Sequence, residues 1–321
     1  MRVRALPRRA AAFLVLILVF ALQAGSAPQK KASWENLDRL LEERKLESAA
    51  AEAAELRAAA QAAGDEEAWT RALLQEAQIR LTLGGFETAA RFLLEQPRPK
   101  EAVHRAAYDI VLAHALRMYT QAYSWEIRQR ERVEGAGPGQ SADLKTWTQD
   151  ELLGTITAAY LDAWKDREAL SEVPVSRLAR FLEVNNYPAE IRGTLRDSLA
   201  YQFAEFLAYS PIWTPRQEME LRRLDLPSLI AGTTPADLAD PGVHPMAKLA
   251  AVLGDLEAWH LAQGNRAAAL EARLERLRAL HARFDRKAER QLIRRDLEER
   301  LPAFRDLPWW SMGMATLAGF V

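Results

Sequence analysis

Hydrophobic residues recur with the spacing of an α-helix along almost the whole chain after residue 32. The segment SWENLDRLLEERKLESAAAEAAELRAAAQAAG predicts two helices, with Ser33 as an N-cap and Gly64 as a stop. The next segment, DEEAWTRALLQEAQIRLTLGGFETAARFLLEQP, repeats the same unit. No stretch of any length alternates with the period of a β-strand. The sequence therefore predicts an all-α fold without a β-sheet.

The second unit has the pattern of a tetratricopeptide repeat, in which small residues let paired helices approach and large residues fill the gaps between them. The first unit echoes the second half of this pattern forty residues earlier. We therefore expect an α-solenoid of antiparallel helix pairs. The matching residues are Ala77, Gly84, Phe86, Ala89 and Leu93, echoed by Leu46, Ala49 and Ala53.

Helical patterning continues over residues 100–133 without a breaker, which predicts one helix about 50 Å long. The segment EGAGPGQSAD then indicates a loop. It is followed by WTQDELL, where Thr148 and Glu151 predict a capping box and Trp147 with Leu152 predicts a hydrophobic staple.

Two more helices are expected near residues 176–184 and 189–209. A proline-punctuated stretch, residues 210–245, is either an irregular connector or a lid over the helical layer. Helix pairs return from Met246 onward. The expected organisation is an N-terminal leader at 1–27, helical hairpins ending in a long helix at 33–134, a loop at 135–146, a helical subdomain at 147–232 and further helix pairs at 244–321.

The leader has the pattern of a secretory signal peptide: four arginines, a thirteen-residue apolar run at 10–22, and small residues after it. At about 1.5 Å per residue, this run spans about 20 Å, less than the ~30 Å hydrocarbon core of a bilayer. Cleavage is expected after Ala24 or Ser26, and an uncleaved membrane anchor is the alternative. We expect a periplasmic, cell-surface or secreted protein.

Composition narrows the function further. A net charge of −1 argues against a general nucleic-acid-binding protein. The absence of cysteine excludes disulfides, thiolate metal sites and a cysteine nucleophile.

No catalytic motif stands out. His104 and His114 share a predicted helix, but their ten-residue separation is not that of a helical zinc pair. The GAGPG segment lacks the preceding strand and the glycine spacing of a phosphate-binding loop. There is no G-x-S-x-G nucleophile motif. The sequence therefore predicts no catalytic residue, no metal site, no cofactor and no enzymatic activity.

The most basic segment, WEIRQRER, is the one candidate interaction patch: Trp125, Arg128, Arg130 and Arg132. These residues have two interpretations. The patch binds an anionic envelope component or the acidic face of a partner, or its arginines complement the dipole at a helix end. Most other tryptophans are expected to pack between helices.

Three segments resemble the helical N-terminal region of large bacterial alpha-2-macroglobulin-like proteins. They are SWENLDRLLEERKLESAAAEAAELRAAAQAAGDEEAWTRALLQEAQIRL, WEIRQRERVEG with DLKTWTQDELLGTITAAYLDAW, and IRGTLRDSLAYQFAEFL. In the last segment, Gly193 replaces a proline of the family. The resemblance covers most of residues 33–210. It implies an envelope protein whose effector is a macroglobulin part, but the Cys-Gly-Glu-Gln thioester motif is absent from this chain, so no active-site residue is transferred.

Two functions from different classes follow as expectations. The first is a non-catalytic exported scaffold, forming the N-terminal part of such a protease-trap protein, with a protein partner or downstream macroglobulin domains as its ligand. The second is the superhelical N-terminal region of a peptidoglycan-acting enzyme. A membrane-anchored repeat adaptor is a third possibility.

The final segment, WWSMGMATLAGFV, bears on this expectation. Trp309, Met312, Gly313 and Thr316 match the first helix of a tetratricopeptide repeat, which predicts that the chain is cut within a repeat. The alternative is a C-terminal helix that docks on the preceding pair.

Overall fold

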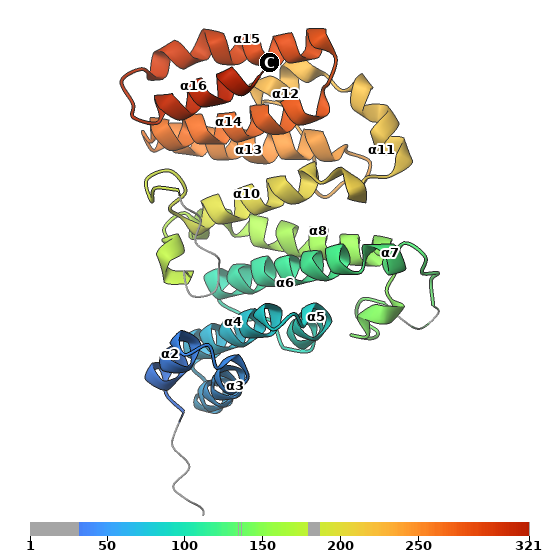
Figure 1. The fold of residues 1–321 in the computed structure, drawn as a ribbon, viewed down its shortest axis with the longest axis vertical. Coiled ribbons are helices and arrows are strands. Elements are labelled where there is room, and N and C mark those ends of the chain that lie inside the picture. Colours follow the sequence, from blue (N-terminus) through green and yellow to red (C-terminus); the bar gives the residue numbers. More distant parts are fainter. Residues whose placement is uncertain (1–31, 134, 136, 179–186, 321) are drawn as a thin grey trace, which may run out of the picture.

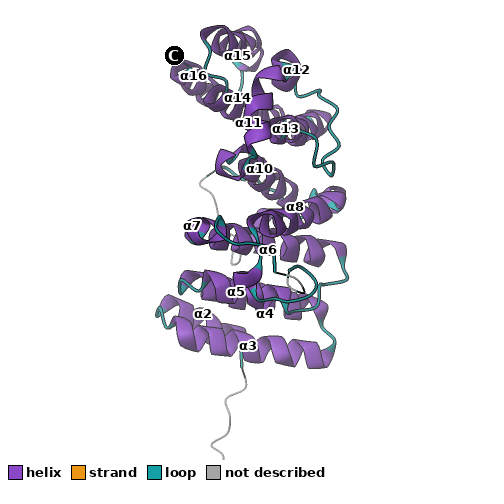
Figure 2. Cartoon of the chain, turned by 90° about the vertical axis from the view of Figure 1, so that its right-hand side faces the viewer, coloured by secondary structure: helices purple, strands orange, loops and turns teal. Residues whose placement is uncertain are grey.

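The computed structural model describes residues 32–133, 135, 137–178 and 187–320, and in these residues the chain forms fifteen α-helices and no strand. The prediction of an all-α fold is confirmed. The helices lie in successive layers along the long axis of the molecule (Figure 1), and the side view in Figure 2 shows the same layering. The assignment of these layers to tetratricopeptide repeats stays a prediction.

The first four helices begin and end largely where the sequence indicates. The Ser33 hydroxyl accepts a hydrogen bond from the Asn36 amide at 3.2 Å, as an N-cap does. Gly64 ends the second helix with a φ of 70°, which an L side chain rarely adopts. These helices are α2 (Trp34–Glu42), α3 (Leu46–Ala63), α4 (Glu66–Thr82) and α5 (Phe86–Leu94).

The prediction of one long helix over residues 100–133 is wrong. Helix α6 (Ala102–Ala122) ends after 21 residues, and the single turn α7 (Ser124–Ile127) follows it. The chain then leaves the helical path, and the Arg130 guanidinium donates to backbone carbonyls of the following loop. These hydrogen bonds to the loop form in place of further helical turns. The helix therefore ends without a glycine or proline that would have indicated its end in the sequence.

The middle of the chain contains α8 (Gln149–Lys165), α9 (Arg167–Leu170) and α10 (Leu195–Ala208). The predicted capping box is confirmed, because Thr148 and Glu151 bond reciprocally at the start of α8.

The helix predicted at 189–209 begins only at residue 195, so its predicted start is wrong. The preceding backbone pairs with residues 173–175 instead: Val175 donates to Gly193, and Leu195 donates to Val173. Gly193 is needed there, because a Cβ would lie 1.8 Å from the Ala189 carbonyl oxygen. Of the helix predicted at 176–184, residues 176–178 belong to a short 3₁₀ helix over 175–178, and residues 179–184 lie outside the described residues.

The proline-punctuated stretch contains α11 (Pro215–Glu220), α12 (Leu226–Ala231) and short 3₁₀ turns. Leu226, Leu229 and Ile230 are buried, and α12 lies against the C-terminal helices, so this part covers the helical layer. The expected helix pairs follow as α13 (Pro245–Ala262), α14 (Arg266–Arg283), α15 (Lys287–Arg300) and α16 (Trp310–Gly319).

Helix α16 packs back on α14 and α15, which is the docking expected of the alternative interpretation. Gly313 lies against Leu301 so closely that an added Cβ would come within 2.3 Å of its side chain. The Phe320 ring stacks on His281 with centroids 4.4 Å apart, and the Trp309 indole donates to Glu271. One face of this helix and the residues at its two ends are therefore packed within the chain, while Met314 stays 41% exposed.

The part of the chain that the structure describes contains no helix long and apolar enough to cross a membrane. The predicted signal peptide, residues 1–27, lies outside that part.

Candidate functional site

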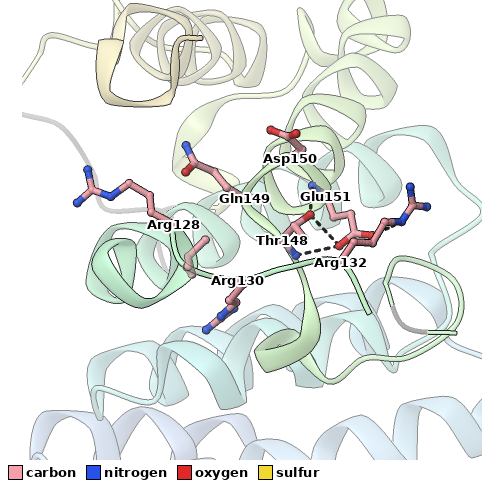
Figure 3. Close-up of a pocket in the computed structure, with 8 residues that line it drawn as sticks. Arg128, Arg130, Arg132, Thr148, Gln149, Asp150 and Glu151 are labelled. Carbon is pink, nitrogen blue, oxygen red and sulfur yellow. Dashed lines mark hydrogen bonds and ion pairs between the residues drawn. The ribbon is translucent and has the colours of Figure 1, made fainter. Parts of the chain in front are cut away.

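Figure 3 shows the predicted arginine patch around the end of α7, beside an open cavity of about 310 Å³. Trp125 is 69% exposed, the second-largest exposed fraction among the large hydrophobic side chains of the described residues. The Arg128 Nε donates to the Ser124 carbonyl at 3.1 Å, so part of this guanidinium caps the short helix. The rest of the Arg128 side chain extends away from Arg132.

Arg130 has a structural role. Its guanidinium donates to the Leu144 carbonyl at 2.8 Å, to the Trp147 carbonyl at 3.2 Å and to the Tyr119 hydroxyl at 3.1 Å. These bonds join the end of α7 to the loop before α8. Arg130 therefore holds the corner that presents Trp125, and its donors are occupied within the chain.

Arg132 lies on the opposite side of this cavity, 3.8 Å from the Glu151 carboxylate, with its side chain 85% exposed. Hydrogen bonds from Thr148 hold the pKa of Glu151 below its usual value, and Arg132 adds to this effect. Asp150 also lines the cavity. The three arginines thus do not converge on one point, and carboxylates lie among them, which is not the arrangement of an anion site.

A second and larger cavity, of about 610 Å³, extends across four layers of the stack. Helices α4, α6, α10 and α14 contribute to its wall, together with the segment before α10, and Figure 1 shows these helices one above another. Its polar lining residues are Gln78, His114, Arg117, Gln121, Tyr187, Arg192, Ser198, Tyr201, Gln202, Glu205 and Glu275.

Arg192 is the central side chain of this wall. Its guanidinium lies between two aromatic rings, 3.8 Å from the centroid of Tyr187 and 3.6 Å from that of Tyr201. It also donates to Glu271 at 2.6 Å and to Glu275 at 3.1 Å. Burial opposes the charge, yet the Glu271 and Glu275 carboxylates hold the pKa of Arg192 above its usual value. The guanidinium is thus a fixed cation.

Arg117 is paired in the same way on α6. Its guanidinium donates to Glu205 on α10 at 2.7 Å and to the Tyr160 hydroxyl at 3.3 Å. Burial again opposes the charge, while Tyr160 and Glu205 raise the pKa of Arg117. Both cations of the cavity are therefore balanced by carboxylates.

Tyr201 is different, because its hydroxyl lacks a hydrogen-bond partner among the described residues although the side chain is 92% buried. Burial raises its pKa well above the usual value, so the hydroxyl stays protonated. The Arg192 Nε is likewise buried without an acceptor there. Such unsatisfied donors are uncommon in a folded protein and call for an explanation.

Sequence patterning did not identify this cavity. Its residues on α6 and α10 follow helical spacing, at 111, 114, 117, 118 and 121 and at 198, 201, 202 and 205. A mainly polar stripe of this kind has the same signature as a solvent-exposed helix face. Only the stacking of the two helices brings these stripes to one cavity.

The histidines do not assemble a metal site in the described part of the chain, where no three potential ligands cluster. The most buried histidine, His260, donates from Nε2 to Asp197 at 2.7 Å. The other oxygen of Asp197 accepts from the Thr194 amide and hydroxyl at the start of α10. This histidine–carboxylate pair therefore anchors a helix end.

The fold and the two cavities define a class, an all-α protein of layered helices. Comparison of the chain with protein-family models, curated proteins and solved structures finds no match.

Proposed function

We propose that this protein is an exported, non-catalytic helical scaffold that binds a protein partner through the corner at Trp125. The observation that carries the proposal is the exposure of this tryptophan on a corner held in place by Arg130. Tryptophan and arginine are enriched at the energetic centres of protein interfaces. Arg128 follows three residues later, and the one hydrogen bond of its side chain among the described residues uses Nε, so the corner offers one aromatic and one cationic contact.

The resemblance to the helical region of alpha-2-macroglobulin-like proteins supports a partner in the bacterial envelope. Downstream macroglobulin domains of the same polypeptide, or a separate envelope protein, would dock on this corner. The leader of residues 1–27 supports export to that compartment.

Affinity purification of the tagged full chain from chemically cross-linked envelopes tests this proposal. Trp125→Ala and Arg128→Glu should each reduce the recovered partner by about tenfold, which is the loss of about 1.4 kcal/mol of binding free energy. Leu261→Ala is the matched control, because Leu261 is 49% exposed on α13. Identical recovery of the partner with all three variants would refute the proposal that the partner binds at this corner.

A separate assay addresses the enzyme interpretation. The full chain is incubated with purified peptidoglycan, and soluble fragments are measured. The scaffold predicts no release above buffer. If fragments are released, and if substitution of a single carboxylate abolishes the release, the scaffold interpretation is wrong and the protein is a peptidoglycan-cleaving enzyme.

A further inference from the structure

The geometry points to a second binding site: the cavity between α4, α6 and α10 takes an extended, uncharged polypeptide segment and holds it by its main chain. This inference does not depend on the Trp125 corner, since no residue lines both cavities.

The shape of the cavity favours an elongated ligand. Its wall includes residues from four helices of the stack, and it is partly open to solvent. Its volume of about 610 Å³ lies within the usual range of ligand sites, ~300–1,000 Å³. A ligand that crosses these layers meets side chains from each of the four helices, most of them from α6 and α10.

The chemistry of the wall favours a ligand with alternating donors and acceptors. The side-chain amides of Gln78 and Gln121 make no hydrogen bond within the described residues, and each can donate and accept. The Gln202 amide donates to Ser198, which leaves its carbonyl oxygen available. An extended peptide presents one N–H and one C=O per residue, the complement of such amides.

The wall also contains hydrogen-bond donors without acceptors, which the carbonyl groups of an extended peptide could supply. The Tyr201 hydroxyl and the Arg192 Nε both donate, and neither has an acceptor among the described residues. A buried donor without an acceptor costs about 1–3 kcal/mol, so a small adjustment of these side chains toward a peptide carbonyl is favourable.

Two other ligand classes fit less well. Sugars and nucleobases stack on open aromatic faces, but the Arg192 guanidinium already covers one face of both Tyr187 and Tyr201. Phosphate and other anions need unpaired cations, but Arg117 and Arg192 are neutralised by Glu205, Glu271 and Glu275.

The test is affinity selection by the full chain from a pool of uncharged dodecapeptides. A second pool has the same sequences with alternate amide nitrogens methylated, which removes main-chain donors. Chitotetraose and inorganic phosphate are titrated in parallel. We expect binding from the first pool and at least about tenfold weaker binding from the second.

Variants locate the site. Gln78→Leu combined with Gln121→Leu should weaken peptide binding by about tenfold, while Gln61→Leu, an exposed position on α3, should leave it unchanged. If the double variant loses its helical circular dichroism, the single Gln121→Leu variant replaces it, because that side chain is already exposed.

Three results would overturn the inference: no peptide is selected, methylated peptides bind equally well, or chitotetraose or phosphate binds in their place. Peptide binding that Trp125→Ala abolishes and the glutamine variants leave intact would also overturn it, while supporting the proposed function. If only this inference fails, the proposal that a partner binds at the Trp125 corner is unaffected and is decided by its own experiment.

Discussion

Gly254 and Gly154 both lie inside long helices, but their surroundings differ. A Cβ at Gly254 would lie 2.1 Å from the Gly232 carbonyl oxygen, which is backbone and cannot move aside cheaply. A Cβ at Gly154 would meet nothing within 4 Å. The first glycine lets α12 end directly against α13, and the second has no packing role.

Alanine substitution at these two positions should therefore have opposite effects. Gly254→Ala should lower the free energy of unfolding by about 1–3 kcal/mol through overpacking. Gly154→Ala should raise it by about 0.5–1 kcal/mol, because alanine favours the helix. Urea unfolding followed by circular dichroism measures both. Equal effects of the two changes would mean that α12 and α13 do not approach so closely.

Asp109 gives the protein a pH dependence that is opposite to that of most ion-paired carboxylates. The side chain is almost fully buried on α6, and although Arg98 donates to it at 2.5 Å, burial raises its pKa to about 6. Asp162 raises this pKa further, and Arg105 lowers it. Because the folded state binds this proton more tightly than the unfolded state, the stability it contributes is complete below about pH 4 and is lost as the pH rises through about 6.

Asp109→Asn removes this titration. The difference in unfolding free energy, wild type minus variant, should fall by about 2 kcal/mol between pH 4 and pH 7.5, since each pKa unit is worth about 1.4 kcal/mol and the unfolded-state carboxyl is already partly ionised at pH 4. Urea unfolding at several pH values measures the difference. If this difference rises with pH over the interval, the ion pair with Arg98, rather than burial, dominates the pKa of Asp109.

At the level of elements, the capping boxes that begin α8 and α10 differ, because only the second of these two is tied to the core. Thr148 and Glu151 start α8 near the surface. Thr194 and Asp197 start α10, and Asp197 also accepts from the buried His260 on α13. The second box therefore joins two helices as well as ending one.

Asp197→Ala should accordingly cost about 2–4 kcal/mol, because it removes a cap and leaves a buried imidazole donor unpaired. Glu151→Ala should cost about 1 kcal/mol. Asp197→Asn, which keeps an acceptor, should recover part of the loss. Thermal unfolding of the three variants gives the comparison, and equal costs for the two alanine variants would contradict a role for His260.

The same two boxes show how far the sequence determines the elements. WTQDELL predicted the start of α8 correctly, because the capping signal and the hydrophobic staple are contiguous. The segment TLRD contains the same kind of capping signal for α10, in Thr194 and Asp197. It was not recognised, because the helical periodicity of the sequence extends back to residue 189. The end of α6 was missed for a related reason, since the bonds of Arg130 to a distant loop replace the helix there.

The candidate site was predicted only in part. The sequence placed Trp125 and three arginines together, but contacts over 14 to 17 residues occupy Arg130 and separate it from its neighbours. The central cavity could not be predicted, because it depends on how α4, α6, α10 and α14 stack.

For the whole molecule, export is the first property to test. The leader predicts a mature protein that begins after Ala24 or Ser26. Mass spectrometry of the protein recovered from the envelope or the medium identifies that end. A protein that retains residues 1–22 in the membrane would favour the anchored adaptor.

The central claim is that the corner at Trp125 contacts a partner. The most direct measurement places the photo-crosslinking residue p-benzoylphenylalanine at position 125 of the full chain in the producing cells, with position 261, another exposed hydrophobic position, as the control. We expect a light-dependent adduct with one protein species, or with downstream domains of the same polypeptide, at position 125 only, and its loss on Arg128→Glu. No adduct at position 125, or the same adducts at both positions, would contradict the account.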